Sequence, residues 1–99
     1  MIKTNNKFRI AEAIRFWNLR HPNKKKKAID VGRLIWSAKK QSIANSIYRL
    51  MDGRAKAMRL CTMKRICEYL EVDANFICGQ TSKYDDEFNR LSDEKVANS

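Results

Sequence analysis

The sequence is short of the residues that carry catalysis or hold a metal ion. It has a single histidine, His21, which stands next to Pro22, and its three cysteines, Cys61, Cys67 and Cys78, lie at spacings of six and eleven. Neither spacing matches the C-x2-C pair of a zinc site, and no glycine-rich phosphate loop or workable carboxylate pair is present. We therefore expect reduced, packed thiols, and no enzymatic activity, metal, cofactor or small-molecule substrate.

Long apolar runs are also missing. No stretch approaches the roughly eighteen apolar residues of a membrane span, and the first residues lack an apolar signal segment. We therefore expect a cytoplasmic protein with no membrane partner. At 99 residues, of which 43% are hydrophobic and 32% charged, the chain suits one domain with a modest core.

Acidic residues are scarce relative to basic ones, with 11 Asp+Glu against 21 Lys+Arg and a net charge of +10. Residues 1–27 hold nine basic and one acidic side chain, residues 28–79 nine and five, and residues 80–99 three and five. A basic body with a mildly acidic tail favours a polyanionic partner, with nucleic acid ahead of an anionic membrane. The alternative is that surplus lysine keeps a small domain soluble, although solubility alone needs less charge.

The apolar spacing predicts an all-α fold, a compact bundle of about five short helices. Residues 1–7 are polar, and we expect them to be frayed. A helical stripe runs from Phe8 to about Arg20 and ends before Pro22. Asn23 then suits the cap of a second helix, whose first turn is Lys24, Lys25, Lys26 and Lys27. This run opposes the helix macrodipole, so either an anion such as DNA phosphate neutralises it, or it is a solvated, flexible loop.

The second helix continues with an apolar stripe that contains a glycine, Gly32, which indicates the close approach of a neighbouring helix. A short polar segment, residues 37–40, leads into a third helix over about 41–52, which Asp52-Gly53 ends. Its start lies between Ser37 and Ser42. Two helices joined in this way form a helix-turn-helix arrangement. The two stripes are Ala28, Val31 and Ile35, and Ile43, Ile47 and Leu50.

A basic connector over residues 54–59 precedes a fourth helix that Thr62 caps, and Asp73 caps a last short turn that Gly79 ends. The inward residues of these two segments are Met63, Ile66, Cys67, Leu70, Phe76 and Ile77. We thus divide the chain into a helix-turn-helix domain, residues 1–79, whose basic charge suits DNA binding, and an acidic polar tail, residues 80–99. Tyr84, Phe88 and Leu91 give the tail the spacing of an amphipathic helix, packed on the body or paired with a second subunit, but three apolar residues also permit disorder.

Two segments resemble the lambda-repressor-like, or Xre/Cro, family of helix-turn-helix DNA-binding proteins. Residues 45–54, NSIYRLMDGR, are similar to the end of that family's recognition helix, and residues 62–79 to its fourth helix and fifth turn. The resemblance covers about Phe8 to Gly79. The chain departs from the family at Ala28, where a glutamine is usual, at Val31-Gly32 for a Leu-Ala pair, and at Trp36 for a turn glycine.

The resemblance implies a recognition helix in the major groove, where base edges present distinct donor and acceptor patterns. Arg49 then contacts guanine, Asn45 adenine and Ala44 a thymine methyl group, with Gln41 and Ser42 added if the helix begins early. Tyr48 contacts phosphate or sugar. The remaining phosphate contacts are basic residues, for each of which the alternative is a solvated side chain: Lys39, Lys40, Arg54, Lys56 and Arg59, supported by Lys24 to Lys27.

The resemblance therefore suggests a sequence-specific, repressor-like transcriptional regulator of phage or mobile-element origin, a homodimer at least on double-stranded DNA. The alternative is a helix-turn-helix module used for protein contact, such as an antitoxin-like partner or an accessory protein of a phage particle, in which the acidic tail is the working part. RNA binding is a further alternative, but the aromatic residues stand at core spacing and not on an open stacking surface.

Overall fold

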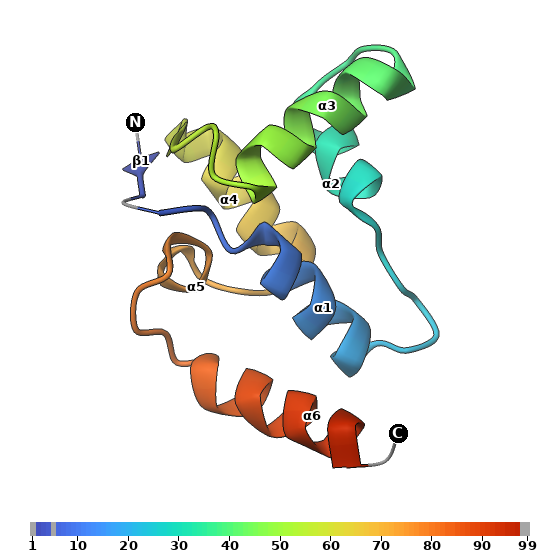
Figure 1. Cartoon of the computed structure of the whole chain (residues 1–99), viewed down its shortest axis with the longest axis vertical. Helices are drawn as coiled ribbons and strands as arrows, with labels where there is room; N and C mark the ends of the chain where they lie inside the picture. Colours follow the sequence, from blue (N-terminus) through green and yellow to red (C-terminus); the bar gives the residue numbers. More distant parts are fainter. Residues whose placement is uncertain (1, 5, 98–99) are drawn as a thin grey trace.

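Helices account for most of the chain, which is all-α as the sequence predicts, and a two-stranded sheet is its one other element among the described residues (Figure 1). The computed structural model describes residues 2–4 and 6–97, with the backbone alone for residues 95–97. The elements are β1 (Ile2–Lys3), α1 (Ile10–Arg20), α2 (Ala28–Ile35), α3 (Lys40–Met51), β2 (Ala57–Met58), α4 (Leu60–Leu70), α5 (Ala74–Cys78) and α6 (Asp85–Ala97). No helix of the described chain is long and apolar enough to cross a membrane.

The core is built around α1, which contacts every other helix of the described chain. Three phenylalanine rings meet at its centre: Phe16 lies 5.7 Å from Phe76 and 5.6 Å from Phe88, and the last two lie 5.5 Å apart. Aromatic side chains bury large apolar areas and prefer such tilted or offset contacts. The three rings therefore join α1, α5 and α6.

The tail forms a helix that packs on the body, which is one of the alternatives that the sequence leaves open. Phe88 of α6 is only 8% exposed, and Tyr84 and Leu91 pack against the same core. The turn before α6 is fixed by Ser82, whose hydroxyl donates to Asp73 at 2.7 Å and whose backbone N–H donates to Asp85 at 2.9 Å. Asn98 and Ser99, the end of the predicted tail, lie outside the described residues.

The predicted start of the second helix is wrong, because α2 begins at Ala28 and not after Asn23. Side chains of α1 take up the backbone groups that a helical first turn would use. The indole N–H of Trp17 donates to the carbonyl of Lys24 at 2.8 Å, and Asn18 bonds both the N–H and the carbonyl of Lys26. The lysine run is therefore a loop.

The predicted cap of the fourth helix is also wrong. Helix α4 begins at Leu60, directly after β2, so that Thr62 lies in its first turn, and Arg59 precedes the helix. The cap of α5 is confirmed, since Asp73 accepts a hydrogen bond from the N–H of Phe76 at 2.9 Å. Gly79 ends this helix with a φ of +79°, a conformation that glycine adopts without a Cβ clash.

The N-terminal residues are not frayed throughout, contrary to the prediction. Ile2 pairs with Met58 and Lys3 with Ala57 in an antiparallel ladder, and the N–H of Thr4 donates to the carbonyl of Lys56 at 2.9 Å. The pairing fixes the connector between α3 and α4, which the sequence alone presents as a basic loop. Met1 and Asn5, which belong to the segment predicted to fray, lie outside the described residues.

Candidate nucleic-acid interface

Helix α3 is held against α2 by close packing at a glycine. A Cβ atom added to Gly32 would lie 2.5 Å from Cγ2 of Ile43 and 3.5 Å from Cβ of Ile47, so the two helices approach as closely as the sequence predicts. The predicted inner stripe of α3, Ile43, Ile47 and Leu50, is buried. The helix therefore presents its opposite face outward, at the top of Figure 1.

The structure settles where α3 begins and ends. Its first helical residue is Lys40, with Lys39 before it, so Gln41 and Ser42 both stand in the first turn. At the other end Asp52 closes the helix and Gly53 follows with a φ of +88°. The stop predicted from Asp52-Gly53 is confirmed. The helix begins early enough to contain Gln41 and Ser42, which is the condition under which the sequence adds them to the candidate base contacts.

The outward face of α3 carries the polar side chains predicted to read bases. Gln41, Ser42, Asn45 and Arg49 are exposed, and Tyr48 is 54% exposed. The side-chain amide of Gln41 donates to the side-chain oxygen of Asn45 at 3.2 Å, so these two amides, one turn apart, act as a connected pair. Ala44 is half-buried and offers less surface than its neighbours.

The segment that carries this face is rich in basic residues and poor in acidic ones. Residues 31–67 include nine Lys or Arg and one acidic residue, Asp52. Arg54 neutralises Asp52 through two contacts of 2.8 Å, and the hydrogen bond from Arg54 lowers the pKa of the Asp52 carboxyl group. Arg54 is thus the one predicted phosphate contact in this region that already binds a carboxylate of the described chain, whereas Lys39, Lys40, Lys56 and Arg59 are exposed.

Two further arginines, which the sequence reasoning did not single out, flank the turn between α2 and α3. Arg33 of α2 and Arg65 of α4 line one hollow of about 440 Å³ together with Trp36, and a guanidinium N–H of Arg65 lies 3.4 Å from the carbonyl of Leu34. Both add positive charge beside the start of α3. Arg33 lies outside the apolar stripe of α2, and this position could have identified it as an exposed cation of the interface. The residues next to Arg65 in the sequence give no such signal.

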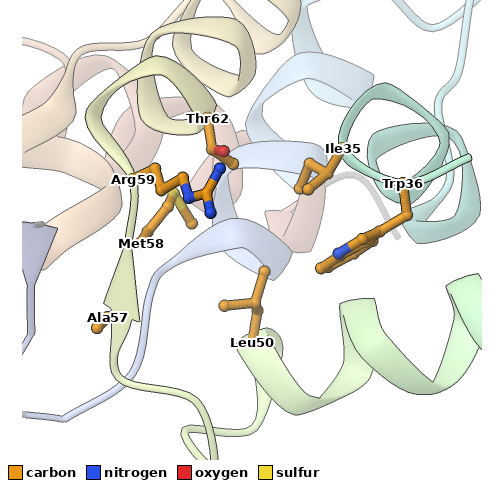
Figure 2. A pocket seen from close by; sticks show the side chains of 7 residues that line it. All are labelled: Ile35, Trp36, Leu50, Ala57, Met58, Arg59 and Thr62. Atoms are coloured by element: carbon orange, nitrogen blue, oxygen red, sulfur yellow. The ribbon is translucent and has the colours of Figure 1, made fainter.

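A cleft of about 430 Å³ lies where α2, α3 and α4 meet (Figure 2). Its apolar lining includes Ile35, Leu50 and Met58, and the indole of Trp36 forms one wall. The Arg59 side chain extends over the cleft from the β2 side, and the residue is exposed. The cleft places an exposed cation at the C-terminal end of α3.

The lysine run is divided by the structure into one engaged and three exposed side chains. Lys24, Lys25 and Lys27 are exposed, whereas the Lys26 ammonium group lies 3.4 Å from the ring centre of Trp17 and donates to the carbonyl of Tyr69 at 2.6 Å. Three of the four lysine side chains of the run are therefore exposed to solvent.

The three cysteines form no disulfide in the described chain, and two of them, Cys67 and Cys78, are half-buried. Burial raises the pKa of the Cys67 thiol to about 11 and raises that of Cys78 as well, so both are protonated at neutral pH. Cys61 is exposed at the start of α4, so the prediction of packed thiols is wrong for this residue, which lies on the solvent side of the helix. No three His, Cys, Asp or Glu side chains of the described residues come together in a way that could hold a metal ion.

In comparisons with known proteins, no family model, no curated protein and no solved structure matches the chain.

Proposed function

We propose that the protein binds double-stranded DNA in a sequence-specific manner, with α3 in the major groove, and acts as a cytoplasmic transcriptional regulator of phage or mobile-element origin. The observation that carries the proposal is the exposed polar face of α3, on a helix held by the contact between Gly32 and Ile43. A major groove is wide enough to admit one α-helix. The resemblance of residues 45–54 and 62–79 to lambda-repressor-like proteins supports the same function.

The side chains of this face suit base recognition. Arg49 binds guanine through its O6 and N7 atoms, and Asn45 binds adenine through N6 and N7. The hydrogen bond between Gln41 and Asn45 restricts the rotation of both amides, so less conformational entropy is lost when they meet a base. Ser42 lies in the first turn, and its hydroxyl group can donate or accept.

The basic side chains beside α3 supply phosphate contacts. If the four exposed cations Lys39, Lys40, Lys56 and Arg59 each neutralise one phosphate, log K falls by about 3.6 for each tenfold rise in salt, at about 0.9 per phosphate. Between 50 and 200 mM salt this slope corresponds to a loss of roughly 100-fold in affinity per subunit. We propose that two subunits bind adjacent half-sites, since proteins that insert one helix per subunit commonly bind palindromic sites as dimers.

Selection of bound sequences from a random duplex library tests the proposal directly. We expect a palindromic motif, and we expect fluorescence anisotropy across a salt series to show tighter binding to it than to random duplex. A protein that binds both duplexes equally at every salt concentration would have only the electrostatic component of affinity, and sequence-specific regulation would be ruled out.

Two variants distinguish base from phosphate contacts. Arg49→Ala should reduce discrimination at one base position, whereas Lys56→Ala should weaken all duplexes alike and reduce the salt slope by about one. Arg90→Ala is the matched control, because it removes the same charge from the exposed face of α6. If Arg49→Ala weakened selected and random duplexes by the same factor, α3 would not be the reading helix.

A further inference from the structure

One lysine of the run, Lys26, occupies a cage formed by two aromatic rings. Its ammonium nitrogen lies 3.4 Å from the ring centre of Trp17 and 3.5 Å from that of Tyr69. It also donates to the carbonyl oxygen of Tyr69 at 2.6 Å. A cation held over two ring faces is attracted by both ring quadrupoles. Lys26 therefore links the loop to α1, through Trp17, and to the end of α4, through Tyr69.

The backbone around Lys26 is fixed by the same end of α1. The Asn18 side chain accepts from the N–H of Lys26 at 2.7 Å and donates to its carbonyl at 3.1 Å. The indole N–H of Trp17 donates to the carbonyl of Lys24 at 2.8 Å, and the N–H of Lys27 donates to Asp30 at 2.9 Å. Side-chain hydrogen bonds thus hold the backbone of the loop over residues 21–27, although four of its seven residues are lysines.

The charge of the other three lysines is not neutralised by the protein. Within the described residues, none of Lys24, Lys25 and Lys27 forms an ion pair, and all three are exposed. Like charges held close together repel one another, so this arrangement lowers stability unless a polyanion approaches. In Figure 1 the loop, α2 and α3 follow one another along the side of the molecule opposite β1.

We propose that Lys26 is a positioning residue that fixes the loop over residues 21–27, so that Lys24, Lys25 and Lys27 form a second phosphate-binding surface, which contacts DNA backbone beyond the bases that α3 reads. This inference rests on the proposed function and deepens it. The partner of the loop is the sugar-phosphate backbone, because three exposed ammonium groups supply positive charge and hydrogen-bond donors, which match phosphate oxygens at any base sequence.

A double-mutant cycle tests the role of Lys26. The variants are Lys26→Met, which keeps an unbranched side chain without the charge, and the loop variant K24A/K25A/K27A, measured alone and combined. We expect the loop variant to reduce the salt slope on random duplex by about 2.7, at about 0.9 per phosphate, with an unchanged base preference. Lys26→Met should weaken binding in the wild-type background and have no effect in the loop variant, because it acts through the other three lysines.

If Lys26→Met lowered the slope by about one in both backgrounds, Lys26 would itself contact phosphate, and the positioning role would be refuted. Lys26→Arg is the matched control, since a guanidinium group also stacks on aromatic faces. We expect it to restore wild-type affinity and slope. If Lys26→Arg bound DNA as weakly as Lys26→Met, that result would also contradict the argument from the aromatic cage.

A measurement without DNA separates this inference from the proposed function. Amide hydrogen exchange of residues 24–28 should become faster in Lys26→Met and stay unchanged in Lys25→Ala, which removes an exposed lysine of the same loop. Unchanged exchange in Lys26→Met would refute the positioning role whatever the protein binds. If the loop variant kept the wild-type slope while Arg49→Ala still lost specificity, the second surface would be refuted and the proposed function would stand.

Discussion

Replacement of Gly32 by alanine should destabilise the protein through one identifiable methyl group. The added Cβ would lie 2.5 Å from Cγ2 of Ile43, a branch methyl that cannot rotate away without moving the side chain or α3 itself. Overpacking of this kind costs about 1–3 kcal/mol, whereas alanine gains roughly 1 kcal/mol over glycine in a helix interior. We therefore expect a net loss of up to about 2 kcal/mol, and a fall in Tm of roughly 4–8 °C for each kcal/mol lost.

Urea unfolding followed by circular dichroism measures this loss, and two replacements of Ile43 identify its cause. Ile43→Leu removes Cγ2 and conserves volume, so Gly32→Ala should be close to neutral or stabilising in that background. Ile43→Val keeps Cγ2 and serves as the matched control, in which the full loss should persist. The packing explanation would be refuted if Gly32→Ala had the same effect in all three backgrounds, or if it stabilised the wild type.

Three further predictions concern charge, the tail and the thiols. Asp52→Ala frees the Arg54 guanidinium group, so it should raise affinity for random duplex severalfold at low salt and steepen the salt slope measured by anisotropy, whereas Asp86→Ala on α6 should change neither. Phe88→Ala removes a ring that contacts Phe16 and Phe76, and should lower the free energy of unfolding measured in urea by about 3–5 kcal/mol; a loss below about 1 kcal/mol would show that α6 is not part of the core. At pH 8 a thiol reagent followed by peptide mapping should label exposed Cys61 first and leave Cys67 largely unmodified, because the pKa of the Cys67 thiol is raised to about 11; rapid labelling of Cys67 would mean that it is not buried as described.

The prediction for Phe88 also changes how a role for the tail in protein contact can be tested. A deletion of residues 80–99 would remove Phe88 from the core and with it the Ser82 contacts to Asp73. Such a variant would lose function under any hypothesis, because the body itself would be destabilised. Substitution of the exposed acidic residues of α6, Asp86 among them, tests the tail and leaves its packing intact.

The features that the sequence predicts correctly depend on neighbouring residues. The stripe of α3, its end at Asp52-Gly53 and the Asp73 cap all follow from side chains within about two turns of one another. The close approach at Gly32 is the exception, since it concerns a second helix. It was predictable because a glycine inside a helix is unfavourable unless its missing side chain is needed.

The features that the sequence misses depend on distant partners. The cap expected at Asn23 fails because Trp17 and Asn18 bond the backbone of the lysine run from α1. The pairing of Ile2 with Met58 joins two residues that are 56 positions apart, and two-residue strands leave no alternating pattern to read. In each case the local preference is weak, and a contact formed only in the folded chain decides the outcome.

Contacts with distant partners also decide how far the net charge of +10 supports polyanion binding. A count treats every cation alike, but several are engaged inside the molecule: Arg9 pairs with Asp85 at 3.5 Å, Arg20 donates to the carbonyls of Leu70 and Glu71, and Lys26 lies in its aromatic cage. A phosphate that approached any of these groups would have to displace a partner that the protein supplies at no further entropic cost. The exposed cations that meet no such competition include Lys39, Lys40, Lys56 and Arg59 beside α3 and Lys24, Lys25 and Lys27 in the loop. If these groups contact phosphate as proposed, substitutions among them should alter the salt slope most.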